Sequence, residues 1–115
     1  MSTAPLAGLK ILSLAEQFPG PYATMLLSDM GAEVIMVERP GVGDPARPFP
    51  PLFRALNRGK RSVALDLKSA EGIARFREMV SKSDVIVEGF RTGKLAALGA
   101  GFEDMRKINP KLIYC

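Results

Sequence analysis

The segment EVIMVE, residues 33–38, places four consecutive apolar residues between two glutamates. Runs of this kind are typical of strands that are buried on both faces of a parallel sheet. The segment DVIVE at residues 84–88 repeats the pattern, and LKILSL at residues 9–14 is a third, mostly apolar run. These runs predict a central sheet that is covered on both sides.

Segments with helical spacing separate the predicted strands. Residues 21–30 form the first helical segment, with a proline suited to the first turn and Gly31 as the stop. Ser69 is a plausible cap for a second helix, in which Ile73, Phe76 and Val80 make an apolar stripe. A third helix is expected over residues 102–108, stopped at Pro110.

The order of these elements predicts the fold class. Further strands are expected at residues 62–67 and 112–115, and a basic loop rich in proline and glycine over about residues 40–61. Strands that alternate with helices imply βαβ crossovers. We therefore expect an α/β, Rossmann-like, mostly parallel sheet with flanking helices, in one domain spanning residues 1–115.

Composition excludes several classes of function for this chain taken alone. The 115 residues include no histidine and one cysteine, Cys115, so an intrachain disulfide, Ser-His-Asp chemistry and most zinc sites are excluded. No apolar run approaches the roughly 20 residues needed to span a bilayer, and the first residues do not form a secretory signal. Because the sequence stops within an apolar strand, we expect it to be the front part of a longer protein, with an incomplete domain.

Positive charge is concentrated between Asp44 and Asp66, where five cations and no acid occur. Such a segment is either a solvated basic loop or an attractor of polyanions. Lys60 and Arg61 precede the third main strand, whereas Lys68 follows it, which separates them by about 20 Å in extended chain. Lys68 is therefore expected at the carboxyl edge of the sheet, and the earlier cations at the opposite edge.

Residues that suit an anion follow several strands. Arg39 comes directly after residues 33–38, and Phe90 and Arg91 follow residues 84–88. GPYAT at residues 20–24 begins the helix after the first strand, and helix amino ends favour anions. GVGDPA at residues 41–46 matches a dinucleotide-binding pattern, but its surrounding prolines prevent the required helix. Together these positions predict one edge that binds a nucleotide-containing anion.

Five ordered blocks resemble a known family. They are PLAGLKILSL, GPYATMLLSDMGAEVIMVERPGVGD, LNRGKRSVALDLKSAEG, DVIVEGF and INPKLIYC, and they cover residues 6–115. In this order they resemble the amino-terminal region of the family III CoA-transferases, a superfamily that includes the α-methylacyl-CoA racemases.

The resemblance implies a domain that binds coenzyme A or acyl-CoA as substrate, without a prosthetic group. It also implies a carboxylic acid substrate, transfer through a mixed anhydride and then a thioester on an aspartate, and an interlocked homodimer of the full-length protein. By position in the motifs, Arg39 would face the phosphate and adenosine region and Leu65 and Lys68 the adenine side. Phe90 is the aromatic position with Arg91 beside it, and Gln17, Phe18 and Pro19 would line the thioester end.

Two departures leave the subfamily open. Gly89 and Thr92 stand where many transferases have asparagine and proline, and EGFR is closer to racemase-like members. LNRGKRS is closer to transferases. The family's catalytic aspartate lies beyond residue 115, so we assign no catalytic residue and expect the chain alone to be inactive.

Three readings of function follow. The first is the CoA-binding part of an acyl-CoA:carboxylate CoA-transferase, with a racemase as the alternative enzyme. The second is a non-catalytic module for nucleotide or nucleic acid, which the few aromatic residues disfavour. The third is a truncated chain without a function of its own. With the first reading we expect a cytoplasmic protein that binds neither nucleic acid nor membrane.

Overall fold

The computed structural model describes residues 3–115 and shows five parallel strands in one sheet. Their order across the sheet is β3-β2-β1-β4-β5, and every neighbouring pair is parallel. The predicted α/β class with a parallel sheet is confirmed. The strands are β1 (Lys10–Ser13), β2 (Glu33–Glu38), β3 (Arg61–Ala64), β4 (Val85–Val87) and β5 (Ile113–Tyr114).

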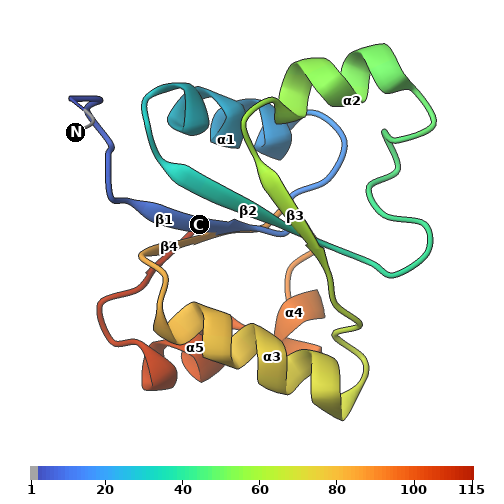
Figure 1. The fold of residues 1–115 in the computed structure, drawn as a ribbon. Coiled ribbons are helices and arrows are strands. Elements are labelled where there is room, and N and C mark those ends of the chain that lie inside the picture. Colours follow the sequence, from blue (N-terminus) through green and yellow to red (C-terminus); the bar gives the residue numbers. More distant parts are fainter. Residues whose placement is uncertain (1–2) are drawn as a thin grey trace.

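Helices cover both faces of the sheet (Figure 1). The first face carries α1 (Pro19–Asp29) and α2 (Pro50–Asn57), which contact each other. The second carries α3 (Ala70–Ser81), α4 (Lys94–Ala97) and α5 (Phe102–Ile108). The sheet is therefore the middle of three layers, which explains why its central strands are apolar on both faces.

Alternation along each strand divides the core between the two faces. Ile11 packs with Val34 and Ala32 on one side, while the next residue, Leu12, belongs to the larger cluster on the other. Phe76, Val80 and Ile86 are fully buried in that larger cluster. The stripe predicted for the helix after Ser69 thus forms the main contact of α3 with the sheet.

The prediction of a loop over residues 40–61 was wrong for residues 50–57. These residues form α2, which begins with Pro50 and Pro51 in its first turn. Proline is compatible with that turn, because the first backbone N–H groups of a helix have no intrahelical acceptor. The prolines that indicated a loop therefore mark the start of a helix.

The third strand is shorter than predicted. It ends at Ala64 rather than Leu67, and the N–H of Leu65 donates one further bond, 3.0 Å long, to the carbonyl oxygen of Glu38. The helix expected from Pro21 begins two residues earlier, at Pro19. Its predicted stop at Gly31 agrees with a φ of 103° there, which favours glycine.

The cations before β3 are paired within the molecule. Arg58 bonds Asp29 at 2.8 Å, and Arg61 pairs with Glu33. Lys60 donates from Nζ to the Pro21 carbonyl oxygen at 2.9 Å and to Asn57 Oδ1 at 2.8 Å. These contacts tie α2 and β3 to α1 and β2, so the positive segment has a structural use inside the fold.

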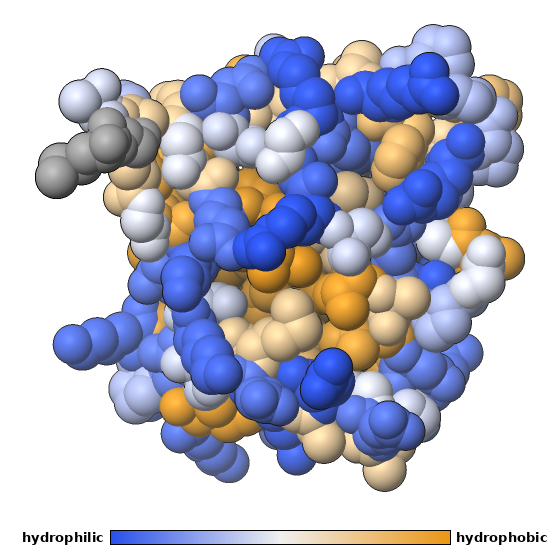
Figure 2. All heavy atoms as spheres, viewed as in Figure 1, coloured by the Kyte–Doolittle hydropathy of each residue, from blue (hydrophilic) through white to orange (hydrophobic). Residues whose placement is uncertain are grey.

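Apolar atoms are also visible on the surface. Figure 2 shows them at the centre of the viewed face, between α3 and the helices of the opposite layer, framed by hydrophilic residues. Within residues 3–115 no helix has the length and apolar character to cross a membrane. The same residues contain no group of three or more His, Cys, Asp or Glu side chains that could hold a metal ion.

Candidate functional site

A cavity of ≈370 Å³ lies where the carboxyl ends of four strands meet. Its position follows from the strand order, because β1 leads to β2 on one side while β4 lies on the other. Ligands in open α/β sheets collect outside the carboxyl ends at such a reversal. The wall is lined by Leu14, Glu16, Val37, Glu38, Arg39, Pro40, Val42, Leu65, Asp66, Leu67, Lys68, Phe90, Lys94, Leu95 and Leu98.

Four of the predicted binding residues line this cavity together. Arg39 follows β2, Leu65 and Lys68 lie between β3 and α3, and Phe90 follows β4. These residues are distant in sequence but lie together in the fold, because each follows the carboxyl end of a parallel strand. The predicted meeting of Arg39, Lys68 and Phe90 at one edge is therefore found in the structure, and their contact with a ligand remains a prediction.

The turn between β3 and α3 is held by local hydrogen bonds. Asp66 Oδ1 accepts from the N–H of Lys68 at 3.0 Å, and Ser69 Oγ accepts from the N–H of Gly72 at 2.9 Å. Ser69 is thus the N-cap of α3, as predicted. A Cβ at Gly72 would stand 1.8 Å from the Asp66 carbonyl oxygen, so this close approach requires glycine.

The cation beside Phe90 is Lys94 rather than Arg91. Lys94 Nζ stands 4.7 Å from the centroid of the Phe90 ring, and both side chains line the cavity. Gly93, with a φ of 85°, precedes α4 and turns the chain so that Lys94 returns toward Phe90. Arg91 lines a neighbouring cavity of ≈220 Å³ with Tyr114. In the sequence, the pair Thr92–Gly93 is the feature that could have indicated this turn of the chain.

Arg39 meets an acid that sequence reasoning missed. Its Nη2 donates to Glu16 Oε2 at 2.9 Å, just beyond the carboxyl ends of β1 and β2. Glu16 is partly exposed and Arg39 more so, with 24% and 56% of their side-chain surface accessible. No local spacing indicates a pair 23 residues apart, so only the parallel register of the two strands could have suggested it.

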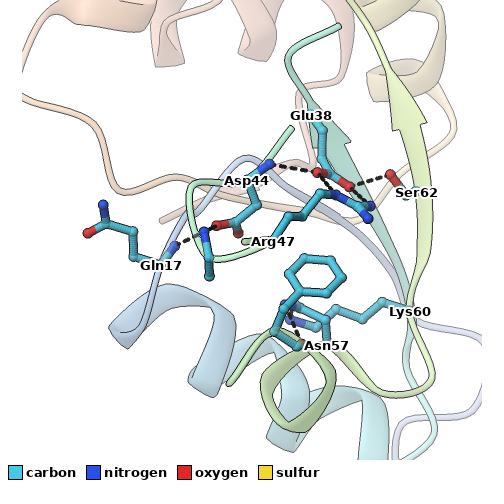
Figure 3. Close-up of polar contacts among 9 residues, drawn as sticks. Gln17, Glu38, Asp44, Arg47, Asn57, Lys60 and Ser62 are labelled. Carbon is cyan, nitrogen blue, oxygen red and sulfur yellow. Dashed lines mark hydrogen bonds and ion pairs between the residues drawn. The ribbon is translucent and has the colours of Figure 1, made fainter. Parts of the chain in front are cut away.

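A second polar cluster surrounds Glu38, which also lines the cavity (Figure 3). Arg47 donates to both carboxylate oxygens, at 2.7 and 2.6 Å, and Ser62 Oγ and the N–H of Asp44 complete the set. The Arg47 bonds are the main cause that lowers the pKa of Glu38 to about 2, against the opposing effect of burial. This cluster joins β2, β3 and the loop before α2.

Gln17, Phe18 and Pro19 form the turn from β1 into α1 and do not line the cavity. Gln17 has a φ of 69°, a left-handed conformation that is unusual for a residue with a side chain. Its N–H donates to Oδ1 of the buried Asp44 at 3.3 Å. Asp44 in turn bonds the Glu38 cluster, so the turn is attached to the same network.

The lysine between this network and α1 is also affected by its surroundings. Burial lowers the pKa of Lys60 to about 8, and the negative charge of Asp44 opposes that shift. Its Nζ contacts only internal acceptors among the described residues. Lys60 therefore belongs to the framework under the site and not to its wall.

Comparison with solved structures places the fold in a class of α/β proteins. The profile described as CoA-transferase family III matches residues 6–115. The chain belongs to this family.

Curated relatives include transferases from distant organisms. The succinyl-CoA:glutarate CoA-transferase of Homo sapiens is 45% identical over 96% of this chain and 27% of that protein. The succinate–glutarate CoA-transferase of Agrobacterium fabrum is 43% identical over 96% of this chain and 31% of that protein. A solved CAIB/BAIF family protein from Brucella suis has a TM-score of 0.93 at 41% identity, over 97% and 32% of the two chains. The chain thus spans about 30% of the length of these relatives.

Proposed function

We propose that this chain supplies the CoA-binding wall of an acyl-CoA:carboxylate CoA-transferase, which moves CoA between a thioester and a free carboxylic acid. The observation that carries the proposal is the joint placement of Arg39, Lys68, Phe90 and Lys94 around one cavity. Cations suit the phosphates of CoA, and the half-buried Phe90 ring suits a purine. The family membership supports the same assignment.

Each side of the cavity suits a different part of CoA. Arg39 offers a planar guanidinium, which can hold a phosphate with two parallel bonds. Lys68 and Lys94 add point charges, and Leu65 with Phe90 provides an apolar surface for adenine. The turn at Gln17, Phe18 and Pro19 lies beside this wall in the chain, next to Glu16, and is proposed for the thioester end.

The chemistry of transfer needs a nucleophile beyond these residues. The enzyme carboxylate attacks the acyl-CoA thioester, which forms a mixed anhydride and releases the CoA thiolate. The thiolate attacks the enzyme's carbonyl in that anhydride, which forms an enzyme thioester and releases the donor carboxylate. The acceptor carboxylate then attacks the enzyme thioester, and the thiolate released attacks the acceptor's carbonyl in the new anhydride, which gives the product thioester and frees the enzyme carboxylate. We assign this role to an aspartate of the longer protein, and the pairing of two such proteins as a homodimer is part of the same proposal. The transferases among the relatives support transfer over racemisation of an α-methyl centre.

Titration calorimetry with CoA tests the proposal on the 115-residue chain. We expect saturable binding by the wild type, and affinity about tenfold weaker in Lys68→Met and in Arg39→Met, since each loses a bond to a charged group. Glu71→Gln is a control, because Glu71 lies in the exposed first turn of α3 and outside the cavity.

The result is specific to the cavity only if Lys68→Met and Arg39→Met weaken CoA binding and Glu71→Gln does not. Equal affinity in wild type, Lys68→Met and Arg39→Met would place CoA elsewhere on the molecule. Similar weakening in both cation variants together with tighter binding by Glu71→Gln would indicate a diffuse electrostatic attraction without a defined site.

A further inference from the structure

The cavity wall contains a negative charge at the position where an anion is expected to bind. Glu16 and Arg39 both line the cavity, and the carboxylate bonds the guanidinium at 2.9 Å. Among residues 3–115, this is the ion pair in which both partners line that wall. A phosphate that approaches Arg39 must therefore compete with the Glu16 carboxylate, which already accepts a hydrogen bond from the guanidinium.

Glu16 is held in this place by the backbone on both sides of it. Ala15 is buried, and a Cβ at Gly20 would stand 2.2 Å from its Cβ, so the start of α1 packs closely on this residue. Gln17 is fixed in its left-handed conformation by the bond to Asp44. With its neighbours anchored, the backbone of Glu16 keeps the carboxylate within reach of Arg39.

The other charged groups that line the cavity do not compete with an anion for Arg39. The Glu38 carboxylate is occupied by Arg47 and Ser62, and its side chain is only 6% exposed. Asp66 accepts from the backbone of its own turn. Lys68 and Lys94 carry positive charge, and Lys94 lies against the Phe90 ring.

We propose that Glu16 is an internal competitor for Arg39 that weakens the binding of the phosphate-bearing end of the substrate. This inference rests on the proposed CoA site and adds a residue that sets its affinity. When the anion binds, the guanidinium exchanges the Glu16 carboxylate for a phosphate, so part of the binding free energy is spent on breaking the Glu16–Arg39 pair. Glu16 thereby makes the bound anion easier to release.

A double-mutant cycle with the 115-residue chain tests this inference by calorimetry. Glu16→Gln keeps the shape of the side chain and removes its charge, and we expect CoA to bind about three- to fivefold more tightly, as expected for one exposed ion pair. In an Arg39→Met background the same substitution should leave CoA affinity unchanged. Glu71→Gln serves as the matched loss of a distant exposed carboxylate and should have no effect.

Two further measurements test whether the gain in CoA affinity depends on the phosphates and on the charge of Glu16. Adenosine, which has no phosphate, should bind wild type and Glu16→Gln equally. The gain for CoA should shrink as salt is raised, because ions screen the pair.

The failures are distinguishable. If CoA binds and Arg39→Met weakens it, but Glu16→Gln binds no more tightly, the inference is overturned and the CoA site stands. A gain that persists in the Arg39→Met background also overturns it. If the wild type does not bind CoA, the proposed function fails and the inference with it.

Discussion

Charged side chains at the site have two roles, and their contacts show which. Arg39 and Lys68 face the cavity, whereas Lys60, Arg47 and Glu38 hold together the elements behind it. The sequence shows only that cations are abundant between residues 39 and 68. Their division into wall and framework depends on strand register, because Arg61 finds Glu33, and Arg39 finds Glu16, across neighbouring parallel strands.

Glu38 should make stability fall in acid. Its pKa is lowered to about 2 from an ordinary value near 4.5, so its stabilising contribution is present above pH 4.5 and is lost as the pH falls toward 2. Glu38→Gln should lower the free energy of unfolding by about 2 kcal/mol at pH 7 and flatten this acid slope. Urea unfolding at several pH values measures both, and a slope as steep as that of the wild type would contradict the assignment.

Lys60 should act in the opposite pH range. Its pKa is lowered to about 8 by burial, so between pH 8 and 10.5 the unfolded chain binds more protons than the folded protein. Stability should therefore rise with pH across this window. Lys60→Met should remove the rise, while the exposed Lys111→Met should keep it. Urea unfolding between pH 7 and 10.5 is the measurement, and an unchanged slope in Lys60→Met would exclude Lys60 as its cause.

At the scale of elements, the turn between β3 and α3 is the most sharply constrained part of the site. Gly72→Ala would drive a Cβ into the Asp66 carbonyl oxygen, so the turn that carries Leu65 and Lys68 must move. We expect a loss of about 1–3 kcal/mol in stability and weaker CoA binding. Gly89→Ala is the matched control, since a Cβ there meets no atom within 4 Å. Thermal unfolding and calorimetry measure both effects, and equal behaviour of the two variants would refute the argument.

The sequence predicts well those elements whose pattern of apolar residues follows from burial alone. EVIMVE is apolar from Val34 to Val37 because helices cover both faces of β2, and the α3 stripe packs into one core cluster with the sheet and α5. The helix α2 was missed because Pro50 and Pro51 occur in helix starts as well as in loops. Lys94 was missed because the turn at Gly93 brings it back to Phe90. Glu16 was missed because its partner, Arg39, follows a neighbouring strand.

At the scale of the whole molecule, one helix face lacks cover among the described residues. Phe18, Tyr22, Leu26 and Met30 recur every four residues along α1, and each is at least 41% exposed. An apolar stripe of this kind favours association. We expect the apparent mass of the 115-residue chain to rise with concentration in sedimentation experiments, and Leu26→Lys to reduce that rise.

The control for association places the same charge on another helix. Ala74 is exposed on α3, away from the α1 stripe, so Ala74→Lys should associate as the wild type does. A wild type that remains monomeric at every concentration would show that the stripe is not adhesive in water. Equal loss of association in both variants would point to net charge as the cause.

The central claim is that substrate lies against the wall formed by Arg39, Lys68, Phe90 and Lys94. Titration of isotope-labelled chain with CoA, followed by amide NMR, tests it most directly. The account predicts that the largest shifts fall on these four residues and on Leu65, at the carboxyl edge of the sheet. Largest shifts along α2, or at the amino ends of the strands around Arg61, would contradict it.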